Sequence, residues 1–195
     1  MTQIYIADCT SYENEQAIAR VLSRMDARRQ EKVRALQSPN KKAQSVVTGL
    51  LLEVAFGPHA AYRYTENGKP YLADNTAYFS ISHSEKWVAL AVSDREIGLD
   101  LQKISPIRPA VLRRCFTPQE QRWIDGDDRR FTQLWVKKEA YGKYTGRGLT
   151  APFATLSYED TVPFCEGEWE QMRYALYGDD TAEIKLVSLH EKDLL

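Results

Sequence analysis

The sequence predicts an α+β fold, because stretches with a helical period and stretches with a strand period alternate along its 195 residues. In the stretch 3–7, Ile4 and Ile6 share one face, which is typical of a half-buried strand. A helical period of apolar residues follows over 18–36, and a second one over 43–54 ends at Gly57-Pro58. Three further strands are predicted as an antiparallel meander, over residues 78–82, 87–92 and 97–101.

A junction near residues 102–110, marked by Pro106 and Pro109, separates this part from a second group of elements. Thr117-Pro118-Gln119-Glu120 is a helix start, because threonine caps the helix, proline suits its first position and the glutamate completes a capping box. We expect a longer helix over residues 131–144 and final strands over 172–177 and 183–188.

Composition excludes several classes of protein. A formal net charge of -1 argues against nucleic-acid binding by the chain as a whole. No apolar run reaches the roughly 18 residues of a membrane span, and the first ten residues lack the basic start and apolar stretch of a secretory signal. Cys9, Cys115 and Cys165 are too widely spaced for a zinc ligand set or a disulfide framework, so we expect reduced thiols in a cytoplasmic protein.

The stretch IGLDLQ, residues 97–102, places alternate side chains on opposite faces of a strand. The apolar set faces a core, whereas Gly98, Asp100 and Gln102 face the other way. An aspartate beside a second oxygen ligand is able to hold a hard cation such as Mg²⁺, which prefers oxygen ligands. The alternative is a solvent-facing strand edge with no ligand.

The stretch WVKKEAYGKYTGRGL, residues 135–149, places Trp135, Glu139 and Lys143 on one stripe of a helix. A Glu–Lys pair at this spacing is an ordinary surface brace when it is exposed. Trp135 favours the other interpretation, in which the stripe is partly buried and the carboxylate needs a partner or a metal.

Two further stretches are candidates for phosphate binding. Ser80-Ile81-Ser82-His83-Ser84 ends a strand in hydroxyls around one imidazole; the alternative is a polar turn, in which serines are ordinary residues. Basic residues gather between Arg20 and Lys42 inside a nearly neutral chain, which suggests an anionic partner. The alternatives there are a solvated helix face and a nucleic-acid module.

The order of these motifs is more specific than any one of them. Gly68-Lys69-Pro70, SISHS, IGLD, FTPQE and WVKKEAYGKYTGRGL follow one another between residues 20 and 149. This order resembles the 4′-phosphopantetheinyl transferases of the surfactin-synthetase-activating type. The resemblance implies transfer of the 4′-phosphopantetheine arm of coenzyme A to a serine of an apo acyl- or peptidyl-carrier protein. Adenosine 3′,5′-bisphosphate is released, and the reaction needs Mg²⁺, with Mn²⁺ as an alternative.

The resemblance also implies the fold and the partners. We expect a monomer of two similar α/β half-domains, each a small mainly antiparallel sheet packed with helices, with an active-site cleft between them. The first half spans residues 1–103 and ends at the metal aspartate; the second spans 104–195 and carries the KEAxxK helix and the carrier docking site. The carrier is expected near residues 111–116, through Arg113 and Arg114. Neither a nucleic acid nor a membrane is expected as a partner.

Site residues follow from the resemblance by position. Asp100 and Glu139 resemble the metal-binding carboxylates, and Glu139 also resembles the base that takes the serine proton. Lys143 resembles the lysine on the pyrophosphate. The expected coenzyme contacts are Arg29, Lys32, Lys69, Ser82 and His83, together with Lys143.

Two residues depart from the family pattern. Gln102 stands where better-known relatives have a glutamate, so it is expected to be a weak metal ligand. The helix around Gln44-Ser45 lacks the arginine that often binds the 3′-phosphate, and Lys41 or Lys42 is the expected substitute. These departures keep a second hypothesis open, in which the protein is a non-catalytic regulator that binds coenzyme A or a carrier protein.

Overall fold

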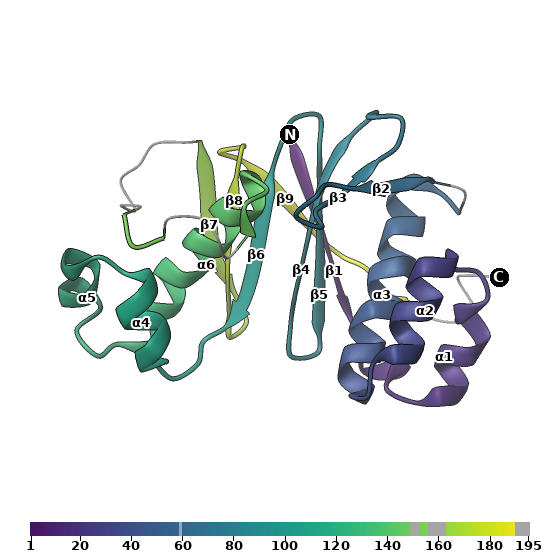
Figure 1. Ribbon diagram of the computed structural model, residues 1–195, viewed down its shortest axis with the longest axis horizontal. Helices are drawn as coiled ribbons and strands as arrows, with labels where there is room; N and C mark the ends of the chain where they lie inside the picture. Colours follow the sequence, from purple (N-terminus) through teal and green to yellow (C-terminus); the bar gives the residue numbers. More distant parts are fainter. Residues whose placement is uncertain (59, 149–152, 156–162, 190–195) are drawn as a thin grey trace.

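The structure is a computed structural model that describes residues 1–58, 60–148, 153–155 and 163–189. Figure 1 shows its helices gathered at two ends, with strands between them. The elements are, in chain order, β1 (Thr2–Asp8), the short 3-10 helix η1 (Thr10–Tyr12), α1 (Glu15–Leu22), α2 (Ala27–Ala35), α3 (Pro39–Phe56), β2 (Tyr62–Tyr64), β3 (Pro70–Leu72), β4 (Tyr78–Ser84), β5 (Trp87–Ser93), β6 (Gly98–Lys103), α4 (Pro109–Cys115), α5 (Pro118–Ile124), α6 (Asp128–Tyr144), β7 (Phe164–Trp169), β8 (Met172–Tyr177) and β9 (Ala182–Leu186).

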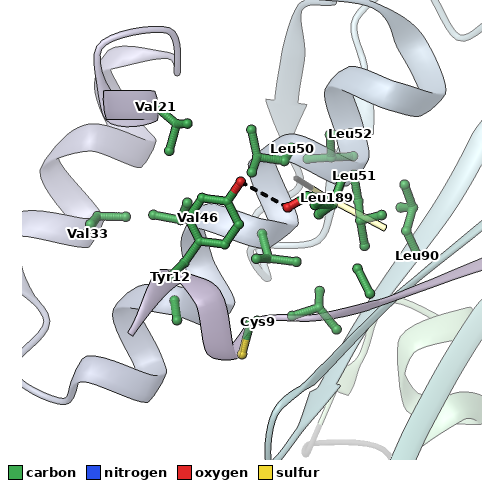
Figure 2. Packing of buried hydrophobic residues seen from close by; sticks show 14 of the residues in the cluster. Cys9, Tyr12, Val21, Val33, Val46, Leu50, Leu51, Leu52, Leu90 and Leu189 are labelled. Atoms are coloured by element: carbon green, nitrogen blue, oxygen red, sulfur yellow. Dashed lines mark hydrogen bonds between the residues drawn. The ribbon is translucent and has the colours of Figure 1, made fainter. Parts of the chain in front are cut away.

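The first sheet has the order β4-β5-β1-β9, and all neighbours are antiparallel except the parallel pair β1 and β9. Its outer face is covered by α3, whose apolar side chains form one core with residues of α1 and α2. Figure 2 shows this core, in which Tyr12 lies among residues of α3 such as Val46 and Leu50, with Leu90 of β5 at the right. Ser38 caps α3 by accepting a hydrogen bond from the backbone N–H of Lys41, and proline occupies the first turn.

The second sheet has the order β6-β8-β7 and is antiparallel throughout. Helix α6 covers one face of it, through Val136 and Ala140 against Ala175 and Tyr177. The other face packs on the first sheet, in a core that joins Ile4 and other residues of β1 and β5 to β6 and β8. The architecture is therefore helix, sheet, sheet, helix, and the α+β fold with small, mainly antiparallel sheets is confirmed.

The predicted meander is wrong at its third strand. Strand β5 pairs with β4 on one side and with β1 on the other, so neither edge is free for β6. Strand β6 instead pairs with β8 in the second sheet and lies beside β4 (Figure 1). The serine hydroxyls of β4 make this junction: Ser80, Ser82 and Ser84 accept hydrogen bonds from the backbone N–H groups of Leu99, Leu101 and Lys103.

The last described strand does not stay with the second group of elements. Strand β9 adds to β1 in the first sheet, and Leu189 packs in the core of α1, α2 and α3. The Tyr12 hydroxyl donates a hydrogen bond to the carbonyl oxygen of Leu189 at 3.4 Å (Figure 2). Residues 182–189, which the predicted division assigns to the second half, thus pack with the first half, and residues 190–195 lie outside the described residues.

The helix signals in the sequence are largely confirmed. Thr117 and Glu120 form the predicted capping box at the start of α5. Helix α6 ends at Tyr144 as predicted and begins at Asp128, because the Asp127 side chain caps it. The predicted helical stretch 18–36 is two helices, since Asp26 starts a new one by accepting a hydrogen bond from the backbone N–H of Arg29.

Candidate active site

A cleft of about 480 Å³ lies between α2, α3 and β4 on one side and the end of α6 on the other. The hairpin of β2 and β3 also lines it. The cationic side chains that line this cleft are Arg28, Arg29, Lys32, Lys41, Lys69 and Lys143. Aspartate and glutamate are absent from the described lining residues. A polyanion such as a nucleotide phosphate is the class of ligand that this lining attracts.

Arg29 and Lys32 lie in the cleft, as the sequence predicted. The Arg29 guanidinium donates a hydrogen bond to the carbonyl oxygen of Ser45 at 2.9 Å, which fixes it between α2 and α3. Burial lowers the pKa of both residues, and the charges of Arg29 and Arg28 lower the pKa of Lys32 further. The cations therefore repel one another, and a bound anion would relieve that repulsion.

Lys41, and not Lys42, reaches the cleft where the sequence lacks the family arginine. The Lys41 ammonium donates to Oε1 of Gln44 at 3.1 Å, and Nε2 of Gln44 donates to the carbonyl oxygen of Glu85 at 2.7 Å. Lys42 instead forms an ion pair with Glu15 at 2.6 Å. Gln44 is buried and thus holds Lys41 at the cleft wall.

Residues 80–84, the SISHS stretch, contribute both to the cleft and to the junction between β4 and β6. His83 lines the cleft, and desolvation followed by the charges of Lys41 and Lys143 lowers its pKa below the usual imidazole value. Ser82 points to the other side of β4, where its hydroxyl contacts β6. The predicted contact between Ser82 and coenzyme A therefore stays a prediction, and the structure gives its hydroxyl different partners.

Lys69 lines the cleft, but its ammonium is engaged with other groups. It forms an ion pair with Glu96 and donates to the carbonyl oxygens of Ile97 and Tyr144, both at 3.3 Å. Nearby, the Asn67 side chain donates to the carbonyl oxygen of Gly146 at 3.1 Å. The turn between β2 and β3 is thereby tied to the end of α6.

Asp100 is buried at the junction of β4, β6 and α6. Its Oδ1 atom accepts hydrogen bonds from the Lys143 ammonium at 2.7 Å and from the Ser82 hydroxyl at 2.8 Å. Lys143 also lines the cationic cleft, so it connects the cleft to the carboxylate. The face of β6 that carries Asp100 packs against α6, which excludes the alternative of a solvent-facing strand edge.

Glu139 lies half-buried on α6, beside Asp100. Burial and then the negative charge of Asp100 raise its pKa to about 7, against the opposing effect of Lys143 and Arg108. Within the described part of the chain, the Glu139 carboxylate has no hydrogen bond or ion pair. A carboxyl with a pKa near neutrality is well suited to accept a proton in catalysis.

The carboxylates also fit a magnesium ion. Two partly desolvated carboxylates repel each other, as the raised pKa of Glu139 records, and a divalent cation between them would remove that repulsion. The described residues contain no group of three or more histidine, cysteine, aspartate or glutamate side chains that could hold a metal. Asp100 and Glu139 would thus need water or ligand oxygens as well, which is the way Mg²⁺ is usually bound. Gln102 is half-buried on the same face of β6.

Comparison with known proteins shows which family the chain resembles. Residues 96–189 match the model of the 4′-phosphopantetheinyl transferase superfamily (ACPS). Over these residues the chain is similar to that superfamily. It is 28% identical over 155 residues to the 4′-phosphopantetheinyl transferase gsp of Aneurinibacillus migulanus, in an alignment covering 76% of this chain and 61% of that protein. A 4′-phosphopantetheinyl transferase of Bacillus subtilis is 29% identical over 151 residues, covering 71% of this chain and 67% of the relative.

A third relative matches a shorter stretch more closely. The 4′-phosphopantetheinyl transferase Sfp of Bacillus subtilis (strain 168) is 37% identical over 98 residues, which cover 47% of this chain and 44% of that protein. The chain thus spans about 61% of the length of the first of these relatives and 44% of the third.

In this chain, the KEAxxK helix is not held by a simple Glu–Lys surface brace. Lys143 pairs with Asp100 across two elements, while Trp135 on the same stripe is 7% exposed and packs against Phe116 and Phe153. Leu149, the last residue of the motif, lies outside the described residues.

Sequence reasoning missed several residues that build the candidate site. Lys138 forms a buried ion pair with Glu120 at 2.8 Å and donates to the carbonyl oxygen of Phe153 at 2.6 Å. Glu120 thus serves both the capping box of α5 and the anchoring of α6. In the sequence, the only signal for this ion pair is the pair of lysines before Glu139, and it does not identify a partner 18 residues earlier in the chain. Gln44 had no signal at all, since its role depends on a carbonyl group in the turn after β4.

Proposed function

We propose that this protein transfers the 4′-phosphopantetheine arm of coenzyme A to a serine of an apo acyl- or peptidyl-carrier protein, in the cytoplasm and as a monomer. The observation that supports this most directly is the position of Lys143. Its ammonium lines a cleft of cations and at the same time contacts Asp100, which lies beside Glu139. The Lys143 ammonium therefore connects the cationic cleft for the polyanion to the carboxylates, and phosphoryl transfer needs both.

In this proposal the cleft binds the phosphates of coenzyme A. Arg29 and Lys32 face the coenzyme from α2, Lys41 and His83 face the 3′-phosphate, and Lys143 contacts the pyrophosphate. Desolvation and neighbouring positive charge lower the pKa of Lys32 and of His83, so their protonated forms gain stability when phosphate oxygens enter. Lys69 would take part only by exchanging one of its present partners for a phosphate oxygen.

The chemical step follows from the carboxylates. The carrier serine Oγ attacks the phosphorus that bears the pantetheine arm, its proton passes to Glu139 directly or through a water, and the P–O bond to the second phosphate breaks. Adenosine 3′,5′-bisphosphate leaves with the electron pair of that bond. In the metal-free protein the pKa of Glu139 is about 7, and a divalent cation bound beside it would lower that pKa and keep the carboxylate ionised, ready to accept the proton. Lys143 stabilises negative charge on the phosphate oxygens.

Mg²⁺, or Mn²⁺ in its place, would be held by Asp100 and Glu139, with Gln102 as a weak third ligand. When bound, such an ion supplies positive charge that stabilises the leaving pyrophosphate oxygens. The amide of Gln102 carries no charge, so it contributes an oxygen but no further electrostatic attraction.

The carrier protein is proposed to dock beside the cleft on α4. Arg113 and Arg114 are exposed there, in a helix with no buried residue, and carrier domains are acidic in the family that this chain resembles. We propose no nucleic acid and no membrane as partners. Among the described residues, no helix is long and apolar enough to cross a bilayer.

Intact-mass spectrometry tests the proposed reaction. Apo fatty-acid carrier and apo peptidyl carrier proteins are incubated separately with this protein, coenzyme A and Mg²⁺, with a chelator control. We expect a chelator-sensitive gain of one phosphopantetheine arm. Binding of coenzyme A without transfer to either carrier would favour the non-catalytic regulator, and salt-sensitive binding to polynucleotide instead would favour the nucleic-acid module.

Lys41 provides a sharp test of how the 3′-phosphate is bound. Lys41→Ala is expected to raise the KM for coenzyme A about tenfold, the effect of losing one charged hydrogen bond of ~1.5 kcal/mol. Lys42→Ala is the matched control, because Lys42 is adjacent and equally charged but pairs with Glu15 outside the cleft. With 3′-dephospho-coenzyme A the two variants should behave alike. An equal effect of Lys41→Ala on both coenzymes would contradict the assignment.

A further inference from the structure

Strands β4 and β6 are joined by hydrogen bonds to serine hydroxyls. Neighbouring strands within one sheet would use backbone carbonyl groups as the acceptors. The hydroxyls of Ser80, Ser82 and Ser84 accept hydrogen bonds from backbone N–H groups at 2.9–3.0 Å, each 19 residues further along the chain. The constant offset means that β4 and β6 run parallel. Figure 1 shows the two strands side by side at the centre of the molecule.

Ser82 differs from the other two serines of the junction. Its hydroxyl accepts from the backbone N–H of Leu101 at 3.0 Å and donates its single proton to Oδ1 of Asp100 at 2.8 Å. The carbonyl oxygen of Leu101 is a second acceptor at 3.5 Å, so the much shorter contact with Asp100 is the stronger of the two. Both residues are buried, so water does not replace either contact readily.

The Oδ1 atom of Asp100 is held from two sides. Ser82 approaches it from β4 in the first sheet, and Lys143 approaches it from α6 beside the second sheet. The described residues offer no hydrogen-bond donor to the Oδ2 atom. The two contacts therefore fix the rotation of the carboxylate and leave one oxygen for a ligand.

We propose that Ser82 is a positioning residue, which orients the Asp100 carboxylate for the divalent cation through the junction of β4 and β6. This inference rests on the proposed function, because it assigns Ser82 a role in the metal site that the transferase needs. A residue that orients a metal ligand typically contributes about 10- to 100-fold to metal affinity or activity. Its role thus differs from the coenzyme contact that the sequence predicted.

The test compares Ser82→Ala with Ser84→Ala. Ser84→Ala loses the same kind of bond, in which the Ser84 hydroxyl accepts from the backbone N–H of Lys103, but Ser84 has no contact with Asp100. Affinity for Mn²⁺ is measured by electron paramagnetic resonance with coenzyme A present, and thermal unfolding is recorded for each variant. Ser82→Ala is expected to weaken Mn²⁺ binding by about 10- to 100-fold, with little change in the KM for coenzyme A. Ser84→Ala should bind Mn²⁺ like the unsubstituted protein, despite a similar loss of stability.

A near-isosteric variant covers the case in which Ser82→Ala does not fold. Ser82→Cys keeps a weak donor at the same position and should give an intermediate Mn²⁺ affinity. Equal Mn²⁺ affinities of the Ser82 and Ser84 variants would overturn the positioning role while leaving the proposed function intact. Absence of Mn²⁺ binding by the unsubstituted protein would overturn the proposed metal site, and the role of Ser82 with it.

Discussion

Replacing Glu139 with glutamine is expected to abolish transfer and, at the same time, to stabilise the metal-free protein above neutral pH. The amide cannot accept the serine proton, and a general base usually contributes about 10²- to 10⁴-fold to the rate. The amide also carries no charge, so it removes the repulsion between Glu139 and Asp100 and the cost of burying an ionised group. Activity and stability therefore change in opposite directions, as expected of a site whose charges serve catalysis.

The pH dependence of stability follows from the direction of the pKa shift. The pKa of Glu139 is about 7 in the folded protein, raised by burial and by Asp100 from an ordinary value of 4.5. Between these two values the folded state binds more protons than the unfolded state, so stability falls as pH rises. The contribution of the protonated carboxyl is present below about pH 4.5 and is lost as pH rises through about 7. Glu139→Gln should flatten this part of the profile.

Urea unfolding at pH 5 and pH 8, in the presence of a chelator, measures the effect, and the mass assay measures transfer in parallel. Glu166→Gln is the matched control, because Glu166 is also half-buried but forms an ion pair with Lys137 at 2.9 Å. Its substitution should not raise stability at pH 8. A Glu139→Gln protein that transfers the arm at the normal rate, or that is less stable than its parent at pH 8, would contradict the assignment.

The part of the site that the sequence predicts is the part that lies within single elements. The alternation in IGLDLQ places Asp100 and Gln102 opposite the apolar residues, and the structure has this arrangement. The helical spacing of Glu139 and Lys143 predicts one stripe, and both residues lie at the carboxylate site. The capping box of Thr117 and Glu120 is equally local.

The remaining features depend on which elements become neighbours. Periodicity indicates that Ser82 lies on one face of a strand, but it does not reveal that the facing strand is β6, bound through hydroxyl groups. The return of β9 to β1 is likewise a long-range pairing that residues 182–186 do not encode locally. Lys69 illustrates the same limit, because its carbonyl partners belong to a helix end and a strand start far along the chain. Such contacts follow from topology, which one sequence does not specify.

Gly98→Ala is expected to lower both the stability of the protein and its transfer activity, as strongly as the loss of a catalytic group lowers activity. Glycine itself has no side chain that takes part in the reaction. A methyl group at this position would lie 2.2 Å from both the carbonyl oxygen of Ala140 and the backbone nitrogen of Tyr144. These are backbone atoms of α6, so no side-chain rotation can relieve the overlap. The helix would have to move off β6, where Val136 and Ala140 pack on the second sheet.

This movement of α6 would also disturb the site, because Asp100 lies two residues along β6 from Gly98 and Lys143 lies on the displaced helix. Their contact of 2.7 Å spans the same interface that the methyl group would open. We expect a loss of at least about 3 kcal/mol in the free energy of unfolding, at the upper end for overpacking. Transfer should fall by more than about tenfold even where the protein remains folded, since misplacing such groups by about 1 Å has larger effects than that.

Gly167→Ala separates this effect from the general cost of placing alanine in a strand. Its methyl group would also be too close to a neighbour, but the neighbour is the far end of the Tyr174 side chain at 2.7 Å, which is able to swing away. Denaturant unfolding and the transfer assay on both variants make the comparison. A Gly98→Ala protein that is no less stable and no less active than Gly167→Ala would show that α6 does not need the close approach to β6. The Asp100–Lys143 pair would then owe its geometry to another contact, such as the Ser82 hydroxyl.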